Sequence, residues 1–303
     1  MTRNQISPYK AMTIIELLVV ILIISILTAL VLTGIQQSRK SAYRTLCSNN
    51  LHQIGIALNQ YISRENHLPP GAAAPAWSPH VALLSDLEQS AVLNSVNFQK
   101  HHISAENNTL SLLRLNTFLC PVDNNPNAGF TNYLGNRGFT TEKMQELGPF
   151  KNGIAVSISS VIDGMSNTIC FSESLTGYRG FERMDDVRKI YKLSKSFTGA
   201  DYPLQLRIAC SHIDRNSSNV HLTPKNYMWY WGDYGHALYN HTLPPNQPTC
   251  QNGGNWQTGA WTASSLHGNG IYSLFIDGHI QWVSATIDND PWFALGTISG
   301  SDY

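Results

Sequence analysis

The apolar run from Ile14 to Ile35 constrains this chain more than any other feature of its sequence. The run is mostly Ile, Leu and Val, and its single charge is Glu16. Because a helix rises about 1.5 Å per residue, roughly 20 residues cross a bilayer core of about 30 Å. A buried core helix is the less favoured interpretation, since the run is apolar on every face. A secretory signal ends in a small-x-small cleavage site, which is missing here, so we expect a retained transmembrane helix over residues 12–35.

Glu16 needs an explanation, because a carboxylate inside an apolar membrane helix costs about 2.5–3.5 kcal/mol on insertion scales. The residues around it, 10–20, read Lys-Ala-Met-Thr-Ile-Ile-Glu-Leu-Leu-Val-Val and resemble the signal of type IV prepilins and type II secretion pseudopilins. In that family a membrane peptidase removes a short basic leader, the new first residue is methylated, and the fifth mature residue is Glu. The resemblance implies a leader over residues 1–11 and processing between Ala11 and Met12.

The same resemblance implies that Glu16 acts in assembly. Its carboxylate would pair with the new terminal ammonium of a neighbouring subunit, which lowers the cost of burying both charges. The implied partners are a prepilin peptidase and other pilin-like subunits, in a homo- or hetero-polymer. The implied location is the bacterial inner membrane, with a single pass and the head outside the cytoplasm. Ala11 stands where the family nearly always has Gly, and Thr33 where many relatives have a kinking Pro.

An amphipathic pattern follows the membrane run. Apolar residues recur at steps of mostly three, four and seven, which predicts that the helix continues over residues 36–65 and lies against the head. The members of this stripe are Leu46, Leu51, Ile54, Leu58, Tyr61 and Ile62. A Pro-rich stretch over residues 66–80 then ends the helix, and the head is expected over residues 66–303.

Within the head, two β-prone runs over residues 271–276 and 279–283 are joined by Asp277-Gly278. This pattern predicts a hairpin with a type I′ turn, in which both central residues have φ > 0. A helix is expected over residues 82–89, and strands over 154–162 and 168–171. These elements indicate an α+β fold, in which a long N-terminal helix packs on a mostly antiparallel, pilin-like head.

Ordered sequence blocks extend the resemblance through almost the whole chain. The pattern is similar to the prepilin-like family named for a C-terminal H-x9-DG motif, here His267 followed by Asp277-Gly278. The other matching blocks are residues 47–51 (CSNNL), 68–71 (LPPG), 120–123 (CPVD), 163–169 (DGMSNTI) and 263–267 (ASSLH). This family is a domain of unknown function, so the resemblance implies an architecture and leaves the biochemical task open.

Several residues have a chemical and a structural interpretation. His267 and Asp277 could form a catalytic pair or bind a metal ion, but a hairpin turn alone requires the Asp-Gly. Asp163, Asn167 and Glu173 could form a Ca²⁺ site, although their spacing differs from that of an EF-hand. We favour turn and strand roles, and expect no metal ion, no cofactor and no enzymatic activity. The GxSxG, HExxH, P-loop and GxGxxG signatures are missing from the sequence.

The chain has five cysteines and no CxxC pair, which argues against a zinc ribbon. In an oxidising compartment Cys47 could bond to Cys120, and Cys210 to Cys250, and the sequence leaves both pairings open. Cys170 is expected to be a buried free thiol.

An aromatic cluster could stack on sugar rings, but packing explains it as well and is favoured. The cluster consists of Tyr227, Trp229, Tyr230, Trp231, Tyr234 and Tyr239. Net charge is zero and only 13% of residues are charged, so no nucleic-acid partner is expected. The favoured function is therefore a structural subunit of a pilus-like or type II secretion-like assembly. One alternative is a membrane-anchored binding module, for example for carbohydrate, that does not polymerise. A less favoured alternative is an anchored hydrolase using His267 and Asp277.

Overall fold

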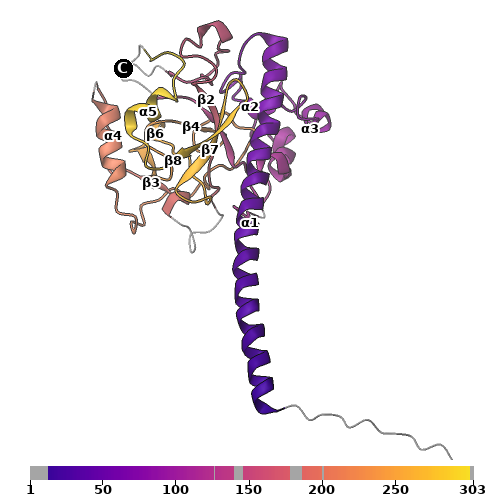
Figure 1. Cartoon of the computed structure of the whole chain (residues 1–303). Coiled ribbons are helices and arrows are strands. Elements are labelled where there is room, and N and C mark those ends of the chain that lie inside the picture. Colours follow the sequence, from indigo (N-terminus) through magenta and orange to yellow (C-terminus); the bar gives the residue numbers. More distant parts are fainter. Residues whose placement is uncertain (1–12, 126, 140–145, 178–185, 200, 301–303) are drawn as a thin grey trace, which may run out of the picture. The chain divides into compact units, whose positions relative to one another are not determined.

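The computed structural model describes residues 13–125, 127–139, 146–177, 186–199 and 201–300 (Figure 1). The predicted processing residues Ala11 and Met12 lie outside the described residues. The chain forms two compact units, one up to Arg44 and one from Thr45 onward.

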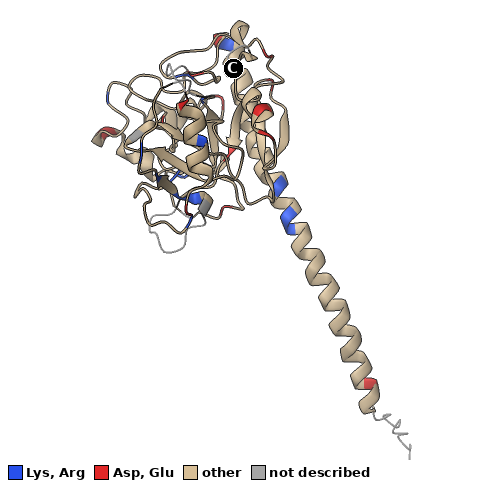
Figure 2. Ribbon diagram, turned by 90° about the vertical axis from the view of Figure 1, so that its left-hand side faces the viewer, with Lys and Arg blue, Asp and Glu red and all other residues tan. Residues whose placement is uncertain are grey.

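Helix α1 (Ile14–Glu65) runs for 52 residues without a break. Its first turn is closed by a capping box, because the backbone N–H and the hydroxyl of Thr13 both donate to Glu16 Oε2 at 2.8 Å. The Glu16 N–H in turn donates to Thr13 Oγ1 at 3.3 Å. After Glu16 the next charged residue is Arg39 (Figure 2). Among the described residues, α1 is the one helix long and apolar enough to cross a membrane.

The part of α1 from Thr45 onward belongs to the second unit and supplies part of its core. One face of the helix is completely buried there, at Cys47, Leu51, Ile54, Ala57 and Leu58. The predicted amphipathic stripe therefore holds for most of its members, but it is wrong for Leu46, which is 48% exposed. The helix ends where Asn66 takes a left-handed φ of 58°, and the Asn66 N–H still donates to the carbonyl of Ile62.

Two sheets form the β-rich part of the second unit. The larger has five strands in the order β4-β1-β2-β7-β8. In chain order its strands are β1 (Tyr133–Asn136), β2 (Ile169–Glu173), β4 (Leu238–Tyr239), β7 (Gly270–Phe275) and β8 (Ile280–Ser284). The smaller sheet consists of β3 (Ile190–Lys192), β5 (Thr249–Asn252) and β6 (Asn255–Ala260). One pair in each sheet is parallel, β1 with β4 in the larger and β3 with β5 in the smaller. The α+β prediction, with mostly antiparallel strands, is confirmed.

Short helices complete the second unit. The α-helices are α2 (Pro79–Ala82), α3 (Ser90–Asn94), α4 (Tyr202–Ser211) and α5 (Asn289–Ala294). The 3₁₀ helices are η1 (Ala105–Leu112), η2 (Asn116–Phe118), η3 (Ile158–Ser160) and η4 (Asp186–Arg188). The main core joins α1 to β2 and β7, whereas α4 packs against the smaller sheet through Leu206 and Cys210.

The predicted hairpin is formed by β7 and β8, but its turn differs from the expected type I′. The Phe275 N–H donates to the His279 carbonyl, and the Gly278 N–H donates to the Phe275 carbonyl, both at 2.9 Å. Gly278 has a φ of 96° and Asp277 does not have a positive φ. This is the three-residue loop in which a type I turn precedes a left-handed glycine.

The hairpin turn packs against α1, and a glycine stands on each side of the contact: Gly278 in the turn and Gly55 in the helix. A Cβ atom on Gly55 would stand 2.8 Å from Leu274 Cδ1, and one on Gly278 would stand 2.8 Å from Asn59 Nδ2. The two glycines therefore let the backbone of the turn and the helix approach each other more closely than side chains would permit.

Two local predictions are wrong. The strand expected over residues 154–162 is replaced by η3, because hydroxyls compete with the sheet for backbone groups: Ser160 Oγ donates to the Ser157 carbonyl at 2.6 Å. The helix expected over residues 82–89 is a series of turns after α2. There Glu88 takes a φ of 59° and the Gln89 N–H donates to the Leu84 carbonyl, a geometry that ends helices.

Replacing Leu51 by Ala should lower the free energy of unfolding by about 2–5 kcal/mol, because the deleted methyl groups leave a cavity under α1. Leu46→Ala is the matched control on the same helix and should change it by less than about 0.5 kcal/mol. The measurement is urea unfolding of the full chain in detergent, followed by tryptophan fluorescence. Equal losses in the two variants would contradict the burial of this face.

Candidate functional site

Four side chains from distant parts of the sequence meet inside the second unit. They are Cys47, Cys120, Glu173 and His267, here called the Cys–His–Glu cluster. Their ligand atoms all lie within 4.8 Å of one another, and all four residues are buried. They come from α1, from the loop after η2, from the end of β2 and from the loop before β7. Three of them stand in the sequence blocks that carry the family resemblance.

A disulfide joins Cys47 to Cys120 in this cluster. His267 lies beside it, with Nε2 at 3.4 Å from Cys120 Sγ and at 3.3 Å from Glu173 Oε1. The other carboxylate oxygen, Glu173 Oε2, accepts the backbone N–H of Tyr272 at 3.0 Å. Glu173 Oε1 is buried and accepts no hydrogen bond. The cluster thus holds a soft sulfur pair, an imidazole and a carboxylate oxygen facing one another.

The structure does not bring His267 and Asp277 together. They are ten residues apart in the sequence, one before and one after the six residues of β7, which span roughly 20 Å, and they have different partners. Asp277 Oδ1 accepts a hydrogen bond from the backbone N–H of His279 at 3.1 Å, and the His279 ring nitrogen lies 2.7 Å from the same oxygen. The hypothesis of a catalytic pair formed by these two residues is therefore wrong.

The three residues suggested as Ca²⁺ ligands, Asp163, Asn167 and Glu173, also do not form one site, because they have different partners. Asp163 Oδ1 accepts the N–H of Gly300 at 2.6 Å, and the Asn167 side chain donates to the Asp163 carbonyl. Glu173 belongs to the Cys–His–Glu cluster instead. The residues over 163–167 therefore form a turn that holds the C-terminal segment.

The other cysteines have simple surroundings. A second disulfide joins Cys210 on α4 to Cys250 on β5, so that the helix is tied to the smaller sheet. Cys170 on β2 is a buried free thiol, and burial raises its pKa well above the usual value. A high pKa removes the thiolate that reactive cysteines require.

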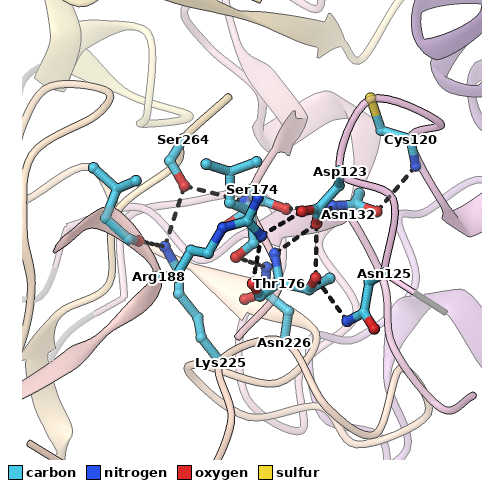
Figure 3. Close-up of polar contacts among 12 residues, drawn as sticks. Cys120, Asp123, Asn125, Asn132, Ser174, Thr176, Arg188, Lys225, Asn226 and Ser264 are labelled. Atoms are coloured by element: carbon cyan, nitrogen blue, oxygen red, sulfur yellow. Dashed lines mark hydrogen bonds and ion pairs between the residues drawn. The ribbon is translucent and has the colours of Figure 1, made fainter. Parts of the chain in front are cut away.

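A buried polar network begins next to the Cys–His–Glu cluster (Figure 3). The Cys120 N–H donates to Asn132 Oδ1 at 3.0 Å, and Asn132 donates to the carboxylate of Asp123. The same carboxylate accepts two hydrogen bonds from Thr176 and forms an ion pair with Arg188. Asp123 and Arg188 are only 2% and 3% exposed, so each charge depends on the other for its burial.

Lys225 is the second buried basic residue near this network, and it is 1% exposed. Its Nζ donates to the Thr262 carbonyl at 2.9 Å and to Ser264 Oγ at 3.3 Å. Burial, and then the charge of Arg188, lowers the pKa of Lys225 to about 7. Sequence reasoning missed Arg188 and Lys225, because no local pattern distinguishes a buried basic residue from an exposed one.

An aromatic cavity of about 640 Å³ lies in another part of the second unit. Its lining includes Tyr227, Met228, Trp231, His236 and Trp256. The His236 ring packs against Trp231 at an interplanar angle of 41°, with centroids 4.0 Å apart, and burial lowers the pKa of His236 to about 4. The imidazole is therefore neutral at pH 7, and Asp233 is the acidic residue of the lining.

Only two members of the predicted aromatic cluster, Tyr227 and Trp231, line this cavity. The other four are buried and serve packing: Trp229, Tyr230, Tyr234 and Tyr239. The backbone beside Tyr227 is strained, since Asn226 and Met228 both have a φ of 63°. Strained positions of this kind tend to occur at ligand sites.

Residues 36–290 match a protein family, SBP_bac_10, described as "Protein of unknown function (DUF1559)". The match covers well over half of the chain, and it includes the Cys–His–Glu cluster, the polar network and the aromatic cavity. No curated protein and no solved structure matches the chain.

The low pKa of Lys225 predicts a pH dependence of stability. An unfolded lysine has a pKa near 10.4, so between about pH 7 and pH 10 the unfolded chain binds a proton that the folded chain lacks. Stability should therefore rise with pH in this window, by up to about 1.4 kcal/mol per pH unit relative to Lys225→Met. Urea unfolding at several pH values measures the difference.

The exposed Lys195 provides the matched control. Lys195→Met should leave the pH dependence of the wild-type protein unchanged. Parallel stability curves for the wild-type protein and Lys225→Met would contradict the burial of a neutral amine at this position.

Proposed function

The chain belongs to this family of proteins of unknown function, DUF1559, and we propose that it is a membrane-anchored, pilin-like structural subunit. The observation that carries the proposal is helix α1. A single uninterrupted helix is apolar and exposed over residues 14–35, and one of its faces is then buried in the core from Cys47 to Leu58. The same element can therefore serve as an anchor in lipid and as a packed part of the soluble unit.

The finer parts of the proposal concern processing and place. A prepilin peptidase removes residues 1–11, and the mature chain begins at a methylated Met12. The protein is a single-pass component of the bacterial inner membrane, with its β-rich unit outside the cytoplasm. Its partners are other pilin-like subunits of a pilus-like or type II secretion-like assembly, and it acts without catalysis. The sequence around Glu16 and the two disulfides, which suit an oxidising compartment, support this proposal.

Glu16 has two roles in this proposal, one in the Thr13–Glu16 capping box and one in assembly, and they can be tested separately. Within the chain its carboxylate closes the first turn of α1 by accepting two hydrogen bonds from Thr13. In the assembly it also neutralises the terminal ammonium of the next subunit. A glutamine can accept the capping hydrogen bonds but carries no charge, whereas an alanine can do neither.

Glu16→Gln and Glu16→Ala should both abolish filament incorporation, because assembly needs the charge rather than the cap. The readout is the fraction of the protein recovered in sheared or sedimented filaments. Glu106→Gln, which removes an exposed acidic group of the second unit, is the matched control and should assemble normally. Intact mass should show that all three variants are trimmed to Met12.

Normal assembly of Glu16→Gln would contradict a role for the charge. Normal assembly of Glu16→Ala as well would show that Glu16 has no role in polymerisation. A native chain that keeps Met1 would contradict processing itself.

The aromatic cavity favours a second candidate, a membrane-anchored module that binds carbohydrate and does not polymerise. Its volume lies within the range of about 300–1,000 Å³ that is usual for small-molecule sites. Trp231 and Trp256 offer flat rings, while Asp233 and Thr223 add polar groups to the lining. This combination suits a sugar, whose apolar face stacks on rings and whose hydroxyls need hydrogen bonds.

If the cavity binds sugar, the full chain in detergent should retain specific oligosaccharides on a glycan array. Trp231→Ala should then raise the dissociation constant by about tenfold, because it removes one aromatic stacking contact. Trp282→Ala replaces a partly exposed tryptophan on β8, which is not part of the cavity lining, and should bind as the wild-type protein does. An array without signal would reject this candidate.

A further inference from the structure

The Cys–His–Glu cluster has the donor set of a structural zinc site. Zn²⁺ is bound by Cys sulfur, His nitrogen and carboxylate oxygen, and it prefers four ligands in a tetrahedron. The four residues offer two sulfurs, one imidazole nitrogen and one carboxylate oxygen, all within 4.8 Å of one another. The chain has no CxxC pair, so these four donor atoms come together only when the chain folds.

The distances between the donor atoms also fit a tetrahedron. With metal–ligand bonds of about 2.0–2.3 Å, neighbouring ligand atoms lie about 3.3–3.8 Å apart. In the structure His267 Nε2 is 3.4 Å from Cys120 Sγ and 3.3 Å from Glu173 Oε1. Two edges of the tetrahedron are therefore already formed, and the disulfide occupies the sulfur–sulfur edge.

The free oxygen of Glu173 is an independent observation. Glu173 is 2% exposed, and its Oε1 is buried beside His267 without accepting a hydrogen bond. Leaving a buried polar atom without a hydrogen bond costs about 1–3 kcal/mol, and more for a charged group. Its other oxygen is fixed by the Tyr272 N–H, so Oε1 is held in place facing the sulfurs and the imidazole. A metal ion would satisfy this oxygen.

We propose that reduction of the disulfide turns the Cys–His–Glu cluster into a tetrahedral Zn²⁺ site. A dithiol reductant supplies two electrons and two protons, so that the disulfide becomes two thiols and the dithiol becomes a disulfide. Zn²⁺ then displaces both thiol protons to solvent and binds two thiolates, the imidazole and the carboxylate. The cluster therefore has two cross-linked states, one closed by a sulfur–sulfur bond and one closed by a metal ion.

A cavity borders the cluster on the side of Cys120. It has a volume of about 350 Å³ and is lined by Cys120 and by Asn50, Leu119, Pro121 and Asn132. The side-chain amides and backbone carbonyls around it are oxygen donors that a hydrated cation can contact on entry. Cys47 and Glu173 lie deeper, which leaves Cys120 as the sulfur that a reductant meets first.

The experiment uses Co²⁺, which reports thiolate ligation and tetrahedral geometry in its absorption spectrum. The full chain in detergent is reduced with a phosphine, freed of reductant without oxygen and titrated with Co²⁺. Reduced protein should bind one Co²⁺ per chain, with a thiolate-to-cobalt charge-transfer band and strong visible bands, and added Zn²⁺ should displace it. Oxidised protein should show neither band.

Ligand variants test the composition of the site. His267→Gln and Glu173→Gln keep the disulfide in their oxidised forms, so their folding can be checked before reduction. Each should weaken Co²⁺ binding by at least about tenfold. The double variant Cys210→Ser/Cys250→Ser, which removes the other disulfide, is the matched control and should bind as the wild-type protein does.

Three results would overturn the proposal. The first is reduced wild-type protein that shows no charge-transfer band, whether it stays folded or unfolds. The second is undiminished binding by both His267→Gln and Glu173→Gln. The third is loss of binding in the Cys210/Cys250 control. If the ligand variants fail to fold, X-ray absorption of the reduced wild-type protein with Co²⁺ decides, because the proposal requires two sulfur and two nitrogen or oxygen neighbours.

Discussion

Burial of one face of α1 from Cys47 to Leu58 is the contact on which the rest of the second unit depends. Each fully buried Leu or Ile contributes about 1.5–3 kcal/mol relative to exposure, and the same face reaches β2 and β7 in the main core. The stripe of Leu51, Ile54 and Leu58 determines which face of α1 is buried, but a stripe that repeats every three or four residues does not by itself fix the level at which the sheet contacts the helix. Fixed points are therefore needed where α1 meets the sheet.

The structure supplies two such points, and both involve residues of the predicted H-x9-DG pattern. His267, before β7, lies beside the disulfide that fixes Cys47 of α1. Gly278, after β7, lies against α1 near Gly55 and Asn59. Cys47 and Gly55 are about two helical turns apart, so the two ends of one strand contact two levels of the same helix. His267 and Gly278 therefore fix the position of the β7–β8 hairpin at two levels along α1.

Local signals in the sequence were sufficient for elements that depend on near neighbours. The periodicity of Leu51, Ile54 and Leu58 predicted the buried face of α1, and Asp277-Gly278 predicted the hairpin. The same signals failed where a local hydrogen bond competed with the pattern, as at Ser160, or where one residue took a left-handed conformation, as at Glu88. The capping box could have been found, since Thr13 followed three residues later by Glu16 is a known sequence signature. The polar core could not, because Asp123 and Arg188 are far apart in sequence and only the folded chain brings them together.

The Cys47–Cys120 link matters for the attachment of α1 in either state of the cluster. It closes a loop of 73 residues, and a cross-link over such a loop stabilises the folded state by about 4 kcal/mol through the entropy of the unfolded chain. Simple reduction would remove this contribution and leave Cys47 held by packing and by the Tyr133 hydroxyl, which donates to its carbonyl at 3.0 Å. A metal ion bound to both thiolates would restore the cross-link. Cys47 of α1 would therefore stay linked to Cys120 as long as either the disulfide or the metal is present. In the reduced, metal-free protein this cross-link is lost.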